Sequence, residues 1–430
     1  MLDAIIVGAG HRAMLYASYA KRHEDRLRIV GVADPDPVRR GKAAGEFGLG
    51  KNQCWQTAQE LAEEPQRADF IINGTMDHQH VSTSVPLLEA GYDMLLEKPF
   101  ATNEREMWRL VETAQRNDSL VSICHVLRYA PFYASIRQRV ENGEIGDVIN
   151  VQLTEHVSYH HMAVGYVRGK WNRESRCHST MLMAKSCHDL DLMVWMKSGV
   201  RPVQVASYGS NFQFRSDNAP EGAGMRCLVD CDIEQECLYS ARKHYIDHPE
   251  RWSFYVWECL EDVDNPTIED KIESLKTDNP FGRCVWKCDN DVVDHQSVVA
   301  NFEDGTTGTL NMIGGSSRPR RSIHLIGTEG EIQGTLDSSQ FVIRHIDPRP
   351  GEEYSEQVVD LTQSGDMTGA FGGHGGGDMR LVHDLVQVLH GEEPSISWTG
   401  IEDSVSGHLL GFCADRARVE DRGVKLEYRS

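Results

Sequence analysis

The feature that most constrains this chain is the stretch from Ala4 to Ala13, which reads AIIVGAGHRA. A short apolar run leads directly into Gly8, Gly10 and the small residue Ala13. Gly8 permits a tight turn, Gly10 lets the backbone approach a pyrophosphate, and Ala13 lets the next helix pack on the strand. The helix N-terminus then offers N–H groups and partial positive charge to phosphates. The pattern predicts a dinucleotide-binding turn.

A second apolar run, Leu27–Ala33, ends at Asp34, about twenty residues after the turn, where an acidic residue binds a ribose hydroxyl. A carboxylate there repels a 2′-phosphate, so the sequence favours NAD over NADP. Arg39 and Arg40 follow closely and are the cations that a 2′-phosphate needs, which leaves NADP as the weaker alternative.

The bulk composition sets the class of protein. A chain of 430 residues with 40% hydrophobic and 25% charged residues is typical of a soluble globular protein with two domains. The net charge of −21 argues against nucleic acid as a partner. No apolar run approaches the ~20 residues that span a bilayer. A strand expected close to Met1 leaves no room for a signal peptide, so we expect a cytoplasmic protein.

Residues 1–126 alternate apolar strands with helical stretches, which predicts a Rossmann domain with a doubly wound parallel sheet. Strands are expected at Ala4–Val7, Leu27–Ala33, Phe70–Asn73, Asp93–Leu96 and Leu120–Ile123. Helices are expected at Ala13–Arg22, Pro37–Phe47, His80–Ala90 and Glu104–Gln115.

Residues 127–430 predict an α+β domain, because several segments alternate apolar and polar residues between glycine turns. We expect a mainly antiparallel open sheet that also joins copies of the chain into a homo-oligomer. Its strands are expected at Val148–Glu155, Val298–Phe302, Thr307–Met312 and Ser322–Ile326. Helices are expected at Ala130–Glu141, Ser186–Lys197, Met379–His390 and Ile401–Arg418.

A second motif, LLEKP at Leu95–Pro99, follows the fourth predicted strand. Together with the glycine turn it resembles the glucose–fructose oxidoreductase, inositol dehydrogenase and rhizopine-catabolism (Gfo/Idh/MocA) family. Further matches extend over almost the whole chain: Thr75, Asp77 and His80, Arg128 with Pro131, Gly143–Gly146, and His188–Asp191. The resemblance implies an NAD-dependent oxidoreductase with a nucleotide domain and a domain for substrate binding and oligomerisation.

The resemblance implies that Lys98 points into the cleft beside the nicotinamide and the substrate hydroxyl. An ammonium there polarises an alkoxide or carbonyl oxygen, and desolvation lowers its pKa towards a usable range. Glu97 is expected to hold Lys98 or the nicotinamide edge, and Pro99 to follow a cis bond. The expected cofactor-binding residues are Gly8, Gly10, His11, Arg12, Asp34, Thr75, His80, Glu97 and Lys98.

The segment Ala184–Asp191 carries the second catalytic signature. In many relatives an aspartate lies one helical turn before the histidine and shares the substrate proton with it. Here that place is taken by Ala184, while His188 stands at the expected site. Lys185, beside Ala184, is expected to supply the charge instead, so the expected catalytic residues are Lys98, His188 and Lys185. A near-neutral pKa suits His188 to acid–base work. The alternatives are a cap or packing residue for His188 and a surface lysine for Lys185.

Polar aromatic residues between 156 and 171 suggest a sugar-binding lip, since hydroxyls take hydrogen bonds and ring faces stack on C–H bonds. The alternative is a polar connection between strands. A glycine-rich run at 371–378 adds His374, and NAD-dependent glycoside hydrolases of the superfamily carry a similar His-Gly-Gly segment. The expected substrate-binding residues are His161, Arg168, Trp171, His188 and His374.

Five of the eleven cysteines lie in a polar insertion near 213–296: Cys227, Cys231, Cys237, Cys284 and Cys288. Four thiolates could hold a structural zinc ion that stabilises an insertion without a core of its own. Free reduced thiols are the alternative.

Three functional hypotheses follow from these motifs. The first is hydride transfer between NAD and a secondary alcohol of a sugar, inositol or related polyol. The second is an NAD-dependent glycoside hydrolase or lyase that works by transient oxidation and elimination, which the missing aspartate at Ala184 and the His374 loop favour. The third, a dinucleotide-dependent sensor without catalysis, is disfavoured by the retained Lys98 and His188.

Overall fold

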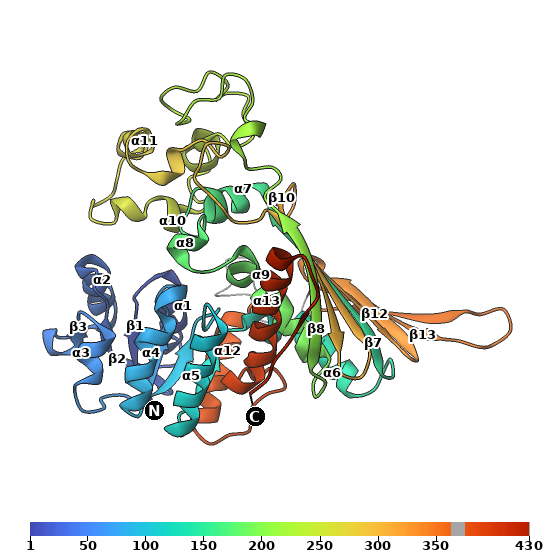
Figure 1. The fold of residues 1–430 in the computed structure, drawn as a ribbon. Coiled ribbons are helices and arrows are strands. Elements are labelled where there is room, and N and C mark those ends of the chain that lie inside the picture. Colours follow the sequence, from blue (N-terminus) through green and yellow to red (C-terminus); the bar gives the residue numbers. More distant parts are fainter. Residues whose placement is uncertain (363–374, 430) are drawn as a thin grey trace.

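The computed structural model describes residues 1–362 and 375–429, and two sheets organise it (Figure 1). The first sheet has six parallel strands in the order β3-β2-β1-β4-β5-β6. They are β1 (Leu2–Val7), β2 (Leu27–Ala33), β3 (Cys54–Trp55), β4 (Phe70–Asn73), β5 (Asp93–Leu96) and β6 (Val121–Ile123). This is the doubly wound order of a Rossmann fold, as the sequence predicted.

Helices cover both faces of the first sheet, which explains its continuous apolar strands. The helices are α1 (His11–Ala17), α2 (Pro37–Phe47), α3 (Ala58–Ala62), α4 (His80–Glu89) and α5 (Glu104–Arg116), with a 3₁₀ turn at Ser18–Lys21. The predicted bounds of β2, β4, β5 and α2 agree with the structure. Sequence reasoning missed β3 and α3, because elements of two and five residues show no periodicity.

The second sheet has nine strands in the order β14-β13-β12-β11-β7-β10-β9-β8-β15. Neighbours are antiparallel except β7 and β10, which run parallel, so the predicted mainly antiparallel sheet is confirmed. The strands are β7 (Val148–Ser158), β8 (Pro202–Ser210), β9 (His295–Phe302), β10 (Thr307–Ser316), β11 (Arg320–Gly327), β12 (Gly330–Thr335), β13 (Gln340–Ile346), β14 (Tyr354–Asp360) and β15 (Val424–Lys425).

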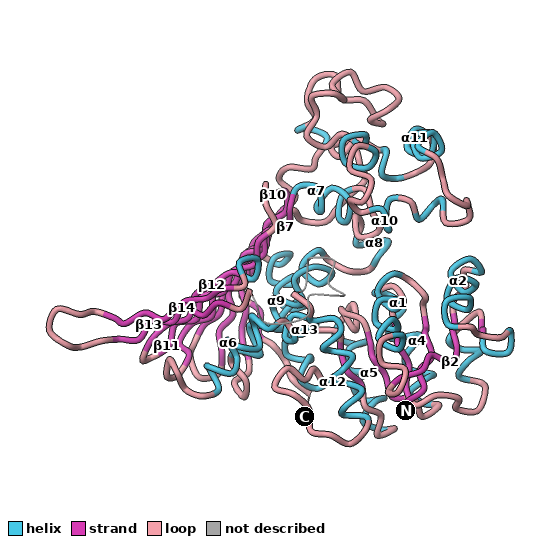
Figure 2. Tube along the Cα trace, turned by 180° about the vertical axis from the view of Figure 1, so that it is seen from behind, coloured by secondary structure: helices cyan, strands magenta, loops and turns pink. Residues whose placement is uncertain are grey.

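Two long helices lie between the sheets, α9 (Met181–Met196) and α13 (Ile401–Glu420), and they pack against each other (Figure 2). Thr180 caps α9, since its side chain accepts from the Met183 N–H at 3.2 Å. The helix therefore begins five residues before the predicted start at Ser186. The remaining helices before it are α6 (Pro131–Glu141), α7 (Tyr159–His161) and α8 (Glu174–Cys177), with helical turns at Val126–Tyr129 and Met162–Val167.

The end of the chain returns to the first sheet. Helix α12 (Gly377–Leu389) packs its apolar face into the same core as the β1 residues Ala4 and Ile6. Just before α13, the Ile123 N–H donates to the Thr399 carbonyl oxygen at 2.8 Å, which extends the edge beside β6. A segment near the C-terminus thus completes the nucleotide fold, so its core draws on residues far beyond the predicted domain boundary at 126.

Residues 211–294 form an insertion between β8 and β9 that lies over the carboxyl ends of β1 and β2 in the first sheet (Figure 1). It contains α10 (Ser253–Val256), α11 (Ile268–Lys276) and short turns at Ser216–Asn218, Arg242–Ile246, Glu258–Leu260 and Pro280–Gly282. The insertion has a small core of its own, built from Cys227, Ala241, Tyr245, Val256, Leu275 and Phe281 around Val164.

Over the two described ranges, no helix is long and apolar enough to cross a bilayer. Alternating burial in β9 leaves one face of the second sheet exposed, with Tyr208, Val299 and Ile313 on its surface.

Candidate functional site

The glycine turn lies between β1 and α1 and has the geometry that a dinucleotide site needs. Gly8 has φ +76°, and a Cβ there would lie 2.8 Å from the Thr75 backbone nitrogen, so only glycine fits. A Cβ at Gly10 would have only the Gly74 carbonyl oxygen within 4 Å, at 3.9 Å. The space beside Gly10 is therefore open to an approaching phosphate. Ala13 packs against Gly74, as its predicted packing role requires.

Asp34 follows β2 and is buried beside this turn. Its carboxylate accepts hydrogen bonds from the backbone N–H groups of Ala9 at 2.7 Å and Asp36 at 2.8 Å. These two bonds orient the carboxylate at the carboxyl end of β2, where an acidic residue reads the ribose. The geometry fits NAD, with the glycine turn for the pyrophosphate and Asp34 for the ribose hydroxyl.

His80 connects the ends of β4 and β5. One ring nitrogen lies 3.0 Å from the Thr75 carbonyl oxygen and the other 2.7 Å from the Pro99 carbonyl oxygen. The Lys98–Pro99 peptide bond is cis, as the family resemblance implied. His80 is almost fully buried, so it holds the turn that carries Lys98 against the end of β4.

Glu97 is the centre of a charged network at the end of β5. Its carboxylate accepts from Arg12 Nε at 2.8 Å, from the Tyr16 hydroxyl at 2.7 Å and from the Lys98 N–H at 2.9 Å. Arg12 Nη2 also pairs with the buried Asp378 of α12 at 2.5 Å. Burial alone would raise the pKa of Glu97, but Arg12 and Lys98 overcome it and hold that pKa at about 2. Glu97 is therefore a fixed anion beside Lys98.

Lys98 reaches across to α9, where its Nζ donates to the Ala184 carbonyl oxygen at 2.9 Å. Ala184 has no polar side chain, so its backbone carbonyl oxygen is the acceptor for Lys98. The contact brings the Lys98 ammonium to the helical turn that ends at His188.

His188 is buried on α9, and its ring centroid lies 5.8 Å from that of His125, which follows β6. Burial, with the Arg128 and Lys98 cations, holds the pKa of His125 well below its ordinary value. Both imidazoles thus lie on the Lys98 side of the cleft. Sequence reasoning missed His125, although its position directly after a parallel strand was a usable signal.

The family residues Arg128 and Asp191 form a buried pair behind this site. Arg128 Nε and Nη2 donate to the two carboxylate oxygens of Asp191 at 2.7 and 2.6 Å. Such a two-point pair fixes the orientation of both groups. It fastens α9, which carries His188, to the turn that follows β6.

Lys185 belongs to a second buried network. Its Nζ lies 3.1 Å from Glu155 Oε1, and Arg321 Nε lies 2.6 Å from Glu155 Oε2 and 3.1 Å from Asp189 Oδ1. Burial lowers the pKa of Lys185 although Glu155 opposes it, and burial raises the pKa of Asp189 to about 6 against Arg321. Lys185 is therefore a paired cation that joins α9 to β7, and the alternative of a surface lysine is wrong.

Aromatic rings from two segments meet above the cleft. The Trp171 indole donates to Asp77 Oδ2 at 3.2 Å, and its ring lies 5.9 Å from that of Tyr255 in the insertion. Lys170 Nζ lies 4.7 Å from the Trp171 ring and 5.2 Å from the Tyr255 ring. Lys170 lies within the segment predicted as the lip, but sequence reasoning missed Tyr255, because only the fold brings the insertion here.

His161 and His11 also meet aromatic residues of the insertion. The His161 ring lies 4.4 Å from Trp252, and His11 stacks on Phe254 at 4.5 Å. Burial and the charge of Lys185 hold the pKa of His161 well below its ordinary value, so the imidazole is neutral. The insertion therefore covers both the segment predicted as a sugar-binding lip and the glycine turn.

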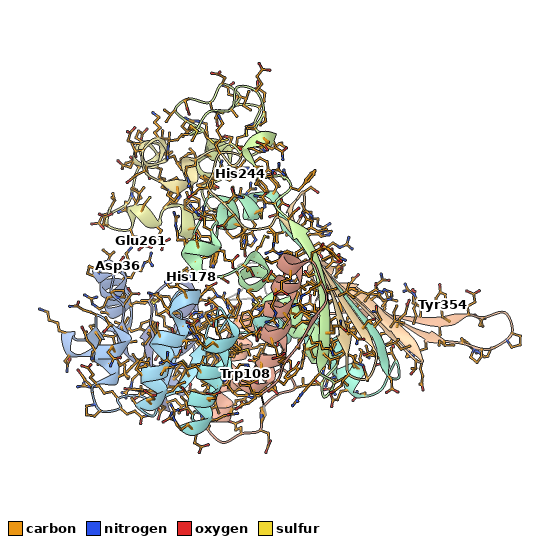
Figure 3. The ribbon with its side chains drawn as sticks, in the orientation of Figure 1. Asp36, Trp108, His178, His244, Glu261 and Tyr354 are labelled. Carbon is orange, nitrogen blue, oxygen red and sulfur yellow. The ribbon has the colours of Figure 1, made fainter. Side chains whose placement is uncertain are left out.

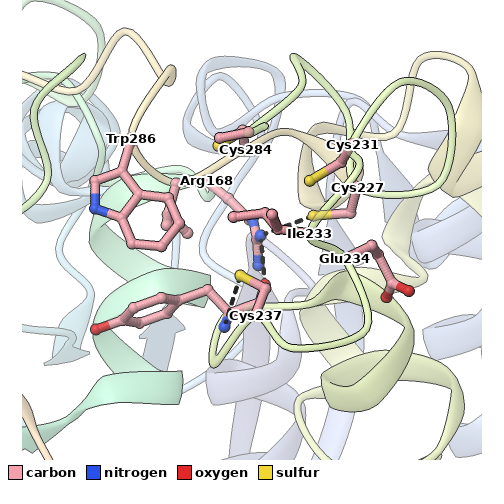
Figure 4. A pocket seen from close by; sticks show the side chains of 11 residues that line it. Arg168, Cys227, Cys231, Ile233, Glu234, Cys237, Cys284 and Trp286 are labelled. Atoms are coloured by element: carbon pink, nitrogen blue, oxygen red, sulfur yellow. Dashed lines mark hydrogen bonds between the residues drawn. The ribbon is translucent and has the colours of Figure 1, made fainter. Parts of the chain in front are cut away.

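Arg168 does not join these residues. Its guanidinium donates to the carbonyl oxygens of Arg283 at 2.6 Å and Tyr239 at 2.7 Å, to the Tyr245 hydroxyl at 3.2 Å and to Cys227 Sγ at 3.4 Å. Its side chain is fully buried within the insertion (Figure 4). The expectation of substrate contact at Arg168 therefore finds no support, and the residue anchors the insertion.

The zinc prediction also needs correction. Within the described ranges, no group of three or more His, Cys, Asp or Glu residues could hold a metal ion. The Arg168 cation lies among Cys227, Cys231, Cys237 and Cys284 (Figure 4), where it opposes a dication. Burial raises the pKa of Cys237, Cys284 and Cys288, the last to about 11, so these thiols stay protonated. All eleven cysteines are free, and the insertion has its own apolar core.

The prediction for His374 lies outside the described residues. The other predicted residues divide into a glycine-turn group with Asp34, a Lys98 group with Glu97 and His188, and an upper group with His161 and Trp171.

Comparison with known protein families identifies the family of this chain. The family described as "Oxidoreductase family, NAD-binding Rossmann fold" matches residues 2–125, and its "C-terminal alpha/beta domain" matches residues 137–426. The chain belongs to the Gfo/Idh/MocA oxidoreductase family. The first of these matches makes the protein an oxidoreductase with an NAD-binding Rossmann fold.

Relatives in this family include YteT of Bacillus subtilis (strain 168), named as a candidate oxidoreductase, which is 25% identical and covers 90% of this chain and 88% of its own. An inositol 2-dehydrogenase of Gluconacetobacter diazotrophicus is 23% identical, covering 72% of this chain and 96% of its own. An inositol 2-dehydrogenase of Corynebacterium glutamicum is 26% identical, and the match covers 54% of this chain and 64% of that protein.

Solved structures share the fold. A levoglucosan dehydrogenase in complex with NADH and levoglucosan has a TM-score of 0.68 at 14% identity, over 99% of this chain and 100% of that one. An oxidoreductase from Agrobacterium radiobacter, in complex with NAD+, L-tartaric acid and magnesium, has a TM-score of 0.67 at 13% identity, over 99% and 98%.

Proposed function

We propose that this protein is an NAD-dependent dehydrogenase that oxidises a secondary alcohol of a sugar, inositol or related polyol. The observation that carries the proposal is the position of Lys98, whose ammonium reaches the His188-bearing turn of α9 at 2.9 Å from the Ala184 carbonyl oxygen. The inositol and levoglucosan dehydrogenases among the similar proteins support the substrate class.

NAD, when bound, accepts the hydride; the residues of the chain handle the proton. Lys98 supplies a cation that polarises the reacting oxygen, and Glu97 beside it balances that charge. We assign His188 the acid–base role, since an imidazole can accept and return a hydroxyl proton. Lys185 is bound by Glu155, so we assign it the role of holding α9 in place.

The upper part of the cleft supports a polyhydroxylated substrate. Trp171 and Tyr255 offer ring faces to C–H bonds, and Lys170 supplies donors to hydroxyl groups between them. His161, neutral beside Trp252, adds one donor and one acceptor. Aromatic faces with few polar groups are typical of sugar sites.

The test is incubation with NAD and a panel of polyols, sugars and glycosides, with NADH absorbance and aglycone release followed together. NADH that accumulates in proportion to product supports the dehydrogenase. Aglycone release without net NADH supports the transient-oxidation glycosidase, which the carbonyl in place of a carboxylate at Ala184 favours. If the protein binds NAD but turns over no compound in the panel, the proposed class of sugar or polyol substrates is contradicted.

A further inference from the structure

The insertion touches the nucleotide fold at a second place, the start of α2. The Arg39 guanidinium pairs with Glu258, and its Nε also lies 3.1 Å from Glu261 Oε2. The Lys42 ammonium donates to the Glu261 carbonyl oxygen at 3.0 Å. These contacts bring the insertion's turn at 258–261 over α2, as the neighbouring labels of Asp36 and Glu261 show (Figure 3).

This place is the corner of the fold where the adenosine ribose is read. Asp34 follows β2 directly, and Asp36 caps α2 by accepting from the backbone N–H groups of Val38 at 2.8 Å and Arg39 at 3.3 Å. In Rossmann folds, an arginine nearby accommodates the 2′-phosphate of NADP. Arg39 and Arg40 are the arginines in this position.

Both arginines are already engaged within the protein. Arg40 Nη1 donates to the Asp34 carbonyl oxygen. Arg39 meets two carboxylates, so Arg39, Glu258 and Glu261 together carry a net charge of −1 instead of the free positive charge of an unpaired arginine. A 2′-phosphate carries about −1.5 to −2 charges at neutral pH and is repelled by such a group.

We propose that Glu258 and Glu261 are specificity-determining residues that exclude NADP by neutralising Arg39 and placing their own charge beside the ribose corner. The proposal rests on the proposed use of NAD and assigns part of that choice to the insertion. Asp34 binds the ribose from the end of β2. The two glutamates neutralise the Arg39 cation at the start of α2.

The test is the double variant Glu258→Gln/Glu261→Gln, measured by calorimetric titration with NAD and with NADP. Glutamine keeps the length of the side chain and an acceptor oxygen for Arg39, so the contact persists without the charge. The ratio of the NADP to the NAD dissociation constant should fall about tenfold or more. This gain in relative affinity for NADP should be smaller at high salt, because both carboxylates are partly exposed and salt screens their charge.

The matched control is Asp262→Asn/Asp264→Asn, which removes the same charge from exposed neighbours. Its ratio should stay close to that of the parent protein, and adding Arg39→Gln to the glutamine variant should reverse the gain. An unchanged ratio in the glutamine variant, or an equal change in the control, overturns the proposal. Failure of the parent protein to bind NAD would instead contradict the proposed function.

Discussion

The Lys98 ammonium donates to the Ala184 carbonyl oxygen at 2.9 Å and so joins the end of β5 to helix α9. The bond joins the two segments that carry the family resemblance, Leu95–Pro99 and Ala184–Asp191, through a backbone atom. A backbone carbonyl is no acid–base group at neutral pH, so the proposed function assigns the substrate proton to His188.

We expect Lys98→Met to lower turnover by ~10²–10⁴-fold, the usual contribution of a positioned acid–base group. The affinity for NAD should stay close to that of the parent protein, because the glycine turn and Asp34 make the other contacts. Steady-state kinetics and calorimetry on the same preparations check both statements. Lys51→Met, at an exposed lysine, is the control. Near-full turnover of Lys98→Met would remove Lys98 from the site.

His188→Ala should reduce turnover to a similar extent. The double variant Lys98→Met/His188→Ala should lose far less than the product of the two single effects, since groups that act as one unit are not additive. The measurement is a double-mutant cycle on kcat. Fully multiplicative losses would show that the two residues act independently.

The buried network around Glu155 predicts a large effect on stability. Glu155→Gln leaves Lys185 and Arg321 as poorly compensated buried cations, and breaking a buried pair costs about 3–5 kcal/mol. Denaturant unfolding measures that loss. Glu331→Gln breaks the more exposed pair with Arg344 and should cost about 1 kcal/mol or less. Equal losses in the two variants would contradict the structural role of Glu155.

Glu97 predicts a dependence of stability on pH. Its pKa of about 2 in the folded protein lies below its ordinary value of 4.5. The stability it contributes is therefore present above about pH 4.5 and is lost as the pH falls towards 2. A shift of this size corresponds to about 3 kcal/mol. The free energies of unfolding of the parent protein and Glu97→Gln should differ most at pH 7, and the difference should shrink steadily as the pH falls from 4.5 towards 2. A constant difference over that range would contradict the low pKa.

The local features were predictable because short-range geometry determines them. The turn at Gly8 needs a positive φ, which glycine adopts freely, and the continuous apolar runs at Leu27–Ala33 and Phe70–Asn73 suit strands buried on both faces. Asp34 could be located because it directly follows such a strand, and Lys98 because the motif at Leu95–Pro99 resembles that of the family. The helix at Pro37–Phe47 was equally clear, with Asp36 as its cap and proline at its first position.

The sequence by itself thus determined the nucleotide fold, the residues at the ends of its strands and the frame of the family. Only the tertiary structure decided which side chains from distant segments of the chain contact one another. Arg168 follows a polar aromatic segment, yet four hydrogen bonds hold it inside the insertion. Arg39 looked available to a phosphate, yet Glu258 and Glu261 neutralise it from more than two hundred residues away. Such pairings depend on how the chain returns through space, and no local pattern of residues records that path.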